Sequence, residues 1–354
     1  MNKKIAVLPG DGIGPEIIEQ AVKALKAIEK KFNHTFEYNY GLIGAIAIDK
    51  TGNPYPEETH TLCSNSDAIL FGAIGDPKYD NDPSAKVRPE QGLLKMRSAL
   101  ELYANIRPVK SYDALLDASP LKNERIKGAD FVVVRELISG IYFGKPRGRS
   151  EDQTIAYDTC VYSKAEILRI TEKAFQFAQN RKKKVTLLDK ANVLATSRLW
   201  RETVTAYAKQ FPDIELECNF IDSAAMEVIT KPTKFDVILT ENLFGDIISD
   251  EASVITGSLG MLPSASLGNK ISLYEPIHGS YPQAAGKNIA NPMATILSAA
   301  LLLEYSFGLL EESKTITNAV EKAMNEGFVT EDINNGKYST TEVGDKIAEY
   351  ILNA

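Results

Sequence analysis

Two aspartates spaced four residues apart, Asp246 and Asp250, stand in the segment NLFGDIISDEAS among large apolar side chains. If this segment is helical, both carboxylates share one face, where like charges destabilise a helix by roughly 0.2–0.5 kcal/mol. A divalent cation would turn this repulsion into attraction, and carboxylate ligands without His or Cys favour Mg²⁺ or Mn²⁺ over Zn²⁺. The alternative is an acidic first helical turn that complements the helix dipole. Asp222 offers a third carboxylate, and with it the pattern favours a metal site.

Charged or amide side chains follow four short apolar segments that are predicted to be strands. The segments are FVVV before Arg135-Glu136, VTLL before Asp189-Lys190, NFI before Asp222, and VILT before Glu241-Asn242. In a parallel α/β sheet, ligands bind beyond the carboxyl ends of the strands, so these side chains would face one crevice. For any single strand end, a chain that simply reaches the surface explains the charge as well. The four ends together favour a polar binding site.

Arginines form a further group of candidate binding residues. Arg97 lies on a predicted helix, Arg107 in the segment ANIRP, and Arg135 at a strand end. The planar guanidinium group suits bidentate binding of carboxylates. Each arginine alone could be structural, but together they indicate a small anionic ligand.

The segment EPIHGSYPQAAGKNIANP, which contains His278, is a loop dense in Gly, Pro and Asn. Such backbone can approach a flat or phosphorylated ligand closely, although a plain loop is an equal alternative. A second glycine-rich turn, Gly10 to Gly14, follows the first predicted strand, but Pro15 interrupts the GxGxxG dinucleotide fingerprint. We therefore reject a Rossmann fold.

Short apolar strands alternate with amphipathic helices along the chain. This alternation predicts an α/β fold in which helices flank a mostly parallel central sheet. The segment 139–162 differs, being glycine-rich and polar with aromatic residues, and is expected to form an irregular arm or hairpin. Predicted strands include Ile5–Leu8, Ala68–Phe71, Phe131–Val134, Val185–Leu188, Phe220–Ile221 and Val237–Leu239, and predicted helices include Leu93–Leu102, Lys164–Ala178, Arg198–Phe211 and Asn291–Leu303.

Composition excludes several classes of protein. The 354 residues include 40 basic and 47 acidic side chains, a net charge of −7 that argues against general binding to nucleic acids or anionic membranes. No apolar run reaches the length of a membrane span. The 3 cysteines lie far apart, which excludes a disulfide framework or zinc ribbon and suits a reducing cytoplasm.

Several of these stretches together resemble the isopropylmalate dehydrogenase family of β-decarboxylating dehydrogenases, relatives of isocitrate dehydrogenase. The stretches are LPGDGIGPE, EQGLLKMRSALELYANIRPVK, RELISGIYFGKPRG, LLDKANVL, TENLFGDIISDEAS and EPIHGSYPQAAGKNIANP, and they span nearly the whole chain. The resemblance implies a two-domain fold. The first domain would comprise residues 1–103 and 257–354 with the cofactor loop, and the second residues 104–256 with the dimer interface and the arm at about 139–162.

The resemblance also assigns roles to individual residues. Arg97, Arg107 and Arg135 would bind the substrate carboxylates. The metal ligands would be Asp246, Asp250 and Asp222, with Asp222 contributed across a homodimer interface and also contacting the substrate. Lys190 would accept the proton of the substrate 2-hydroxyl as hydride leaves, and Tyr142 would protonate the enol carbon after decarboxylation. Binding of NAD is implied for His278, Gly279, Ser280, Gln283, Gly286, Asn288, Ile289 and Asn291.

Within this family, substrate choice rests on a motif that reads Glu90-x-x-Leu93-Leu94 here. The two leucines could bury an isopropyl group, which is worth roughly 1.5–3 kcal/mol. The expected reaction is NAD-dependent oxidative decarboxylation of (2R,3S)-3-isopropylmalate to 4-methyl-2-oxopentanoate and CO₂ in leucine biosynthesis, with Mg²⁺ or Mn²⁺. Homoisocitrate, tartrate or malate, and isocitrate remain alternatives.

One departure from the family bears on the cofactor. NAD-using members usually have an aspartate, which holds the ribose hydroxyls and repels a 2′-phosphate, where this chain has Gln283. No Lys or Arg replaces it, so NAD remains the expectation. A cytoplasmic homodimer that binds neither nucleic acid nor membrane is expected. The rival hypothesis is a carboxylate-binding or phosphoryl-transfer protein without a redox cofactor, which would not need the His278 loop to bind adenosine.

Overall fold

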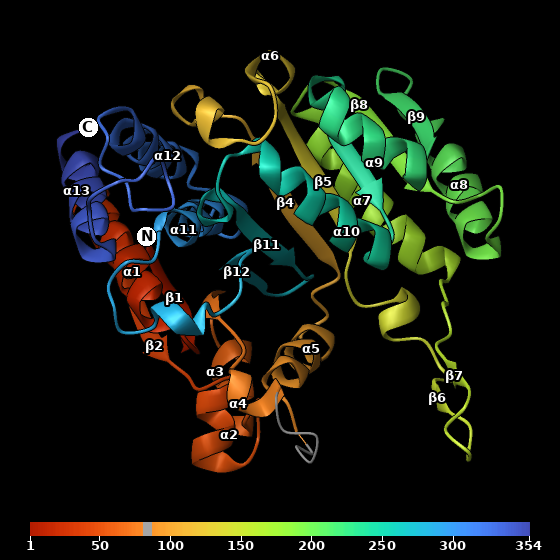
Figure 1. The fold of residues 1–354 in the computed structure, drawn as a ribbon, viewed down its shortest axis with the longest axis horizontal. Helices are drawn as coiled ribbons and strands as arrows, with labels where there is room; N and C mark the ends of the chain where they lie inside the picture. Colours follow the sequence, from red (N-terminus) through yellow and green to blue (C-terminus); the bar gives the residue numbers. More distant parts are fainter. Residues whose placement is uncertain (81–86) are drawn as a thin grey trace. The chain divides into compact units, whose positions relative to one another are not determined.

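The computed structural model describes residues 1–80 and 87–354, which form two compact units (Figure 1). Unit 1 comprises Met1–Leu102 and Gly257–Ala354, so that both termini belong to it, and unit 2 comprises Tyr103–Thr256.

Unit 1 is built on strands in the order β2-β1-β3-β12-β11. β1 pairs in parallel with β2 and β3, and β3 pairs in parallel with β12, whereas β11 runs antiparallel to β12. The strands are β1 (Asn2–Gly10), β2 (Thr35–Tyr40), β3 (Ala68–Ala73), β11 (Pro263–Leu267) and β12 (Ser272–Pro276). The helices are α1 (Gly14–Phe32), α2 (Ala45–Thr51), α3 (Glu57–Ser64), α4 (Pro77–Asp80), α5 (Pro89–Ala99), α11 (Met293–Tyr305), α12 (Leu310–Asn325) and α13 (Thr340–Asn353).

The core of unit 1 follows from the apolar character of its central elements. Every residue of β3 is buried, as expected for a strand covered on both faces. Helix α11 is apolar nearly all round and almost wholly buried, whereas α1 buries one amphipathic face.

Unit 2 repeats this architecture with strands in the order β4-β5-β10-β8-β9. β5, β10, β8 and β9 run parallel, and β4 is antiparallel to β5. The strands are β4 (Ala104–Lys110), β5 (Asp130–Glu136), β8 (Lys184–Asp189), β9 (Glu215–Phe220) and β10 (Val237–Thr240). The helices are α6 (Asn123–Ile126), α7 (Lys164–Gln179), α8 (Ala195–Ala208), α9 (Ile221–Thr230) and α10 (Asn242–Ala252).

The segment 139–162 includes a short antiparallel hairpin of β6 (Gly148–Arg149) and β7 (Ala156–Tyr157), which projects from unit 2 (Figure 1). The expected hairpin is therefore present, and its contact with a partner chain stays a prediction.

The α/β fold with mostly parallel strands between helices is confirmed, but some predicted boundaries are wrong. Phe220–Ile221 is not a strand: β9 ends at Phe220 and α9 begins at Ile221. Asp222 therefore lies in the first turn of a helix, where its carboxylate complements the helix dipole. The helix predicted at Leu93–Leu102 spans Pro89–Ala99, because Pro89 fits the first helical position.

Within residues 1–80 and 87–354, no helix has both the length and the apolar character needed to cross a bilayer. Cys63, Cys160 and Cys218 are all free thiols, in agreement with the expected absence of a disulfide framework.

Candidate active site

Helix α10 carries Asp246 and Asp250 in unit 2. Its first turn contains no acidic residue, so the alternative that these aspartates complement the helix dipole is wrong. Asp246 forms an ion pair with Nη1 of Arg135 and accepts a hydrogen bond of 2.9 Å from the Tyr142 hydroxyl. Arg107 lies 3.9 Å away. Two guanidinium groups and a phenol therefore surround the Asp246 carboxylate.

Arg135 is fixed by its neighbours before any ligand arrives. It lies near the end of β5 and is only 3% exposed. Its Nε and Nη2 atoms donate to Asn242 Oδ1 at 3.1 and 2.7 Å. A Cβ atom at Gly245 would lie 2.5 Å from Arg135 Cγ, so glycine is required where the arginine crosses α10. Asn242 is therefore a buried structural residue that orients Arg135.

Arg107, on β4, joins the second aspartate to this group. Its Nη1 atom donates to Ser249 Oγ at 2.5 Å and to Asp250 Oδ1 at 3.1 Å. The structure therefore brings together five predicted site residues, namely Arg107, Arg135, Tyr142, Asp246 and Asp250. Cationic and anionic groups alternate in this cluster, which suits an acid bound together with a cation.

Electrostatics set the protonation states of the cluster. Burial acts to raise the pKa of Asp246, but Arg135, Tyr142 and Arg107 outweigh it and hold the pKa below its usual value. Burial and the hydrogen bond to Asp246 raise the pKa of Tyr142. At neutral pH the aspartate is therefore ionised and Tyr142 keeps its proton.

Lys190 and Asp222 form a separate pair in unit 2. Lys190 directly follows β8, and its Nζ donates to Asp222 Oδ1 at 2.5 Å. The strand end is held by Asp189, which accepts two hydrogen bonds of 2.8 Å from Arg201. The hydrogen bond from Lys190 lowers the pKa of Asp222, whose side chain remains 67% exposed. Asp222 is thus an ionised carboxylate with an oxygen open to another ligand.

The three predicted metal ligands do not converge within one chain. Across residues 1–80 and 87–354, no group of three or more His, Cys, Asp or Glu side chains is placed to hold a metal ion. Asp246 and Asp250 lie one helical turn apart, whereas Asp222 pairs with Lys190. The donor chemistry fits Mg²⁺ or Mn²⁺, since all three are carboxylates. The addition of Asp222 from a second chain stays a prediction.

The predicted substrate residues of α5 belong to unit 1 and differ in their surroundings. Arg97 donates from Nη2 to Glu275 Oε1 on β12 at 2.9 Å. Leu93 is only 9% exposed and packs in the core, whereas Leu94 is 39% exposed. Of the two leucines, only Leu94 offers its side chain to a ligand. Sequence spacing could not separate them, because adjacent residues on a helix point in different directions.

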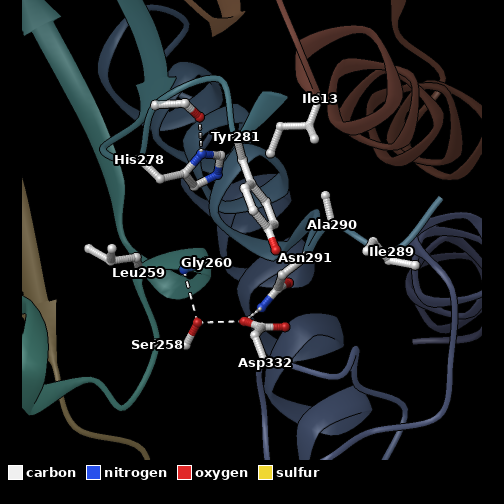
Figure 2. A pocket seen from close by; sticks show the side chains of 11 residues that line it. Ile13, Ser258, Leu259, Gly260, His278, Tyr281, Ile289, Ala290, Asn291 and Asp332 are labelled. Atoms are coloured by element: carbon white, nitrogen blue, oxygen red, sulfur yellow. Dashed lines mark hydrogen bonds between the residues drawn. The ribbon is translucent and has the colours of Figure 1, made fainter. Parts of the chain in front are cut away.

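The loop after β12 borders a cavity of about 520 Å³ in unit 1 (Figure 2). Of the residues expected to bind NAD, the lining includes His278, Gly279, Ile289 and Asn291, but not Ser280, Gln283, Gly286 or Asn288. Sequence reasoning did not identify the other lining residues, which are Ile13, Ser258, Leu259, Gly260, Tyr281, Ala290 and Asp332. The only sequence signal of these residues was the apolar character of Ile13, Leu259 and Tyr281, since distant segments form the cavity.

The glycine-rich turn before α1 supports this loop. The Ile13 amide donates to Ser280 O at 2.8 Å, and a Cβ atom at Gly12 would lie 2.0 Å from the same oxygen. The Glu16 carboxylate accepts hydrogen bonds from the amides of Gly286 and Asn288. The GDGIGPE segment is therefore a structural support for the loop. Glu16 was a positioning residue that sequence reasoning missed.

His278 presents a neutral ring. Its Nδ1 lies 3.0 Å from Gly279 O, and because a carbonyl can only accept, Nδ1 carries the hydrogen and Nε2 is an acceptor. Burial lowers the pKa of His278. Asp332 accepts hydrogen bonds from Ser258 Oγ at 2.5 Å and Asn291 Nδ2 at 3.0 Å. Within residues 1–80 and 87–354, no Lys or Arg lines the cavity.

Glu90 of α5 lies close to Ser280 in the loop after β12. A Cβ atom at Gly75 would lie 3.0 Å from Glu90 Oε1 and 3.5 Å from Ser280 Oγ, which places both side chains beside one glycine. A predicted substrate residue and a predicted cofactor residue are therefore neighbours within unit 1.

Comparison with known proteins gives a consistent result. Residues 4–347 match the isocitrate/isopropylmalate dehydrogenase family. The chain is 55% identical to the 3-isopropylmalate dehydrogenase of Aquifex aeolicus, over 98% of this chain and 96% of the relative. It is 52% identical to that of Bacteroides fragilis, over 100% of both chains. The solved structure of isocitrate dehydrogenase from Methylococcus capsulatus superposes with a TM-score of 0.88 at 32% identity, covering 99% of each chain. The chain belongs to the isocitrate/isopropylmalate dehydrogenase family.

Proposed function

We propose that this protein catalyses the NAD-dependent oxidative decarboxylation of (2R,3S)-3-isopropylmalate to 4-methyl-2-oxopentanoate and CO₂, a step of leucine biosynthesis. The relatives named 3-isopropylmalate dehydrogenase, which are 52–55% identical over at least 97% of this chain, support the reaction. The structural observation that carries the proposal is the cluster in which Asp246 meets Arg135, Arg107 and Tyr142.

Asp246 and Asp250, together with Asp222 of a second chain, would hold Mg²⁺ or Mn²⁺. When bound, the cation supplies Lewis-acid stabilisation of negative charge on substrate oxygens. The cavity beside His278 would hold the adenosine half of NAD. NAD fits better than NADP because, among the residues that the structure describes, no Lys or Arg lines this cavity to pair with a 2′-phosphate.

The chain's own residues bind the substrate and move its protons. Arg97, Arg107 and Arg135 bind the carboxylates through guanidinium hydrogen bonds. Lys190 would accept the proton of the 2-hydroxyl, and NAD, when bound beside it, would supply the hydride acceptor. A lysine can accept a proton only as a free amine, so Lys190 must lose the positive charge of its ion pair with Asp222 before this step, while it stays beside that carboxylate. Tyr142, which keeps its proton at neutral pH, then protonates the carbon that has lost CO₂.

Leu94 would contact the isopropyl group, because its side chain is exposed whereas Leu93 is packed in the core. Glu90 lies beside Ser280 of the cofactor loop, where it would border both ligands. Homoisocitrate, tartrate or malate, and isocitrate are the alternative substrates, and they would need polar contacts in place of Leu94.

We further propose a cytoplasmic homodimer that shares its active sites. Asp222 cannot join Asp246 and Asp250 within one chain as the described residues are placed, which supports its contribution from a partner. Exposed apolar side chains on the arm, α9 and α10 are suited to burial in an interface, namely Ile155, Met226 and Ile247. The free cysteines suit a reducing compartment. The two compact units would be the two domains of the family.

The test is turnover measured as reduction of the nicotinamide. The protein is mixed with Mg²⁺ and NAD or NADP, and 3-isopropylmalate, isocitrate, homoisocitrate and tartrate are compared as substrates. We expect the highest kcat/KM with 3-isopropylmalate and NAD. Binding of a diacid without any nicotinamide reduction across this panel would contradict the proposal and favour a carboxylate-binding protein that lacks a redox cofactor.

A further inference from the structure

Three large apolar side chains are exposed around the cavity in unit 1. Tyr281 is 54% exposed, Leu259 51% and Ile289 41%, and all three line this cavity. Figure 2 shows the Tyr281 ring between His278 and Ile13, with its hydroxyl directed towards Asn291. Apolar surface of this kind, with a few polar groups at its margin, is typical of a site for a flat ligand.

The backbone of Tyr281 adds a second observation. Its φ of 39° and ψ of 64° lie in the left-handed region, which disfavours a side chain as large as tyrosine. Pro282 follows directly, and the Ala284 amide donates to Tyr281 O at 3.0 Å, so the 3₁₀ turn Pro282–Ala284 fixes this conformation. Glycine would fit the same backbone without strain. An aromatic ring held here against that preference indicates a binding role.

Polar atoms at the margin of the cavity match the edge of a purine rather than a phosphate. His278 Nε2 is an acceptor, because Nδ1 donates to Gly279 O. Asn291 provides an amide and Asp332 a carboxylate. The exocyclic amine of a purine could donate a hydrogen bond to His278 Nε2 or to the Asp332 carboxylate. The same carboxylate would repel an anion such as a phosphate.

We propose that Tyr281 provides an aromatic face on which the adenine base of the dinucleotide stacks. The inference rests on the proposed NAD-dependent function and adds a binding residue to it. Gln283, which does not line the cavity, has a neutral amide in place of the carboxylate that usually holds the ribose hydroxyls in this family. Stacking on Tyr281 supplies affinity through the base instead, and it acts on NAD and NADP alike.

The experiment measures nucleotide binding by calorimetry, without turnover, for the full-length protein and its Tyr281→Phe, Tyr281→Leu and Tyr281→Ala variants. Loss of base–aromatic stacking weakens binding roughly 5- to 150-fold. We expect this loss for AMP and NAD in Tyr281→Ala, an intermediate loss in Tyr281→Leu, and a change within about twofold in Tyr281→Phe. Binding of nicotinamide mononucleotide should not change. Tyr40→Ala is the matched control, since Tyr40 is 61% exposed elsewhere in unit 1.

A spectroscopic readout tests stacking directly. The single tryptophan of the chain, Trp200, is buried in unit 2, so its emission gives a constant background. In Tyr281→Trp, AMP should quench the added emission, whereas ribose 5-phosphate should not.

Unchanged AMP affinity in Tyr281→Ala, or tighter binding, would overturn the stacking role while leaving the NAD-dependent function in place. Failure of the unmodified protein to bind AMP or NAD would overturn both proposals.

Discussion

Complementation between inactive variants offers a sharp test of which residues act together. Lys190 and Asp222 are joined by a 2.5 Å ion pair, whereas Asp246 belongs with Arg135 and Tyr142. If Asp222 reaches the active site of a partner chain, Lys190 must reach the same site. Each active site would then take Lys190 and Asp222 from one chain and Asp246 from the other.

The expected magnitude follows from this division. In a mixture of Lys190→Met and Asp246→Asn chains, a mixed dimer has one site with both defects and one intact site. Random pairing makes about half of the dimers mixed, so about a quarter of wild-type activity should return in the whole mixture, and about half in mixed dimers isolated from it. In a mixture of Lys190→Met and Asp222→Asn chains, both sites of a mixed dimer carry one defect each, and no activity should return.

The assay co-expresses two differently tagged variants, isolates mixed dimers through both tags, and measures NAD reduction with 3-isopropylmalate. Native mass spectrometry confirms that both mixtures contain mixed dimers. Equal return of activity in the two mixtures would refute the claim that Lys190 and Asp222 come from one chain and Asp246 from the other. If no activity returned in the Lys190→Met and Asp246→Asn mixture, the claim that the two chains share their active sites would be refuted.

Further predictions concern specificity and stability. Leu94→Ala should lower kcat/KM for 3-isopropylmalate roughly 10- to 200-fold, with the unfolding free energy nearly unchanged, because Leu94 is 39% exposed. Leu93→Ala should instead destabilise the protein by about 2–5 kcal/mol in urea denaturation, because Leu93 is packed in the core. If Leu93→Ala lowered kcat/KM and Leu94→Ala lowered stability, the assignment of substrate contact to Leu94 and core packing to Leu93 would be wrong. Burial, aided by the Asp189 charge, raises the pKa of Glu241 to about 7. The folded state therefore keeps a proton that the unfolded state releases near pH 4.3, so stability should fall as the pH rises from about 4.5 to about 7. Glu241→Gln should flatten this fall when urea denaturation is compared at pH 5 and pH 8, and an unchanged slope would contradict the cause.

The sequence predicted those parts of the fold and site that depend on local patterns. Alternation of apolar strands and amphipathic helices predicted the mostly parallel α/β architecture. Four-residue spacing placed Asp246 and Asp250 on successive turns of one helix, as found. The polar side chains after the segments FVVV and VILT were expected to face one crevice, and two of them, Arg135 and Asn242, are hydrogen-bonded to each other.

Features that depend on packing between distant segments were not predictable. The helical start at Ile221 made Asp222 part of α9, although the preceding residues have strand character. Leu93 and Leu94 are chemically identical, and only the packing of α5 against the core separates them. In the sequence, nothing distinguishes Tyr281 from other loop residues. Only its backbone conformation and the cavity beside it indicate a binding role.

Binding of Mn²⁺ to the dimer in the presence of 3-isopropylmalate, followed by electron paramagnetic resonance, tests the shared carboxylate site most directly. The unmodified protein should bind one ion per chain, and Asp222→Asn, Asp246→Asn and Asp250→Asn should each weaken the affinity at least about tenfold by removing one carboxylate ligand. If Asp222→Asn bound Mn²⁺ as tightly as the unmodified protein, the claim that three carboxylates from two chains hold the cation would be contradicted.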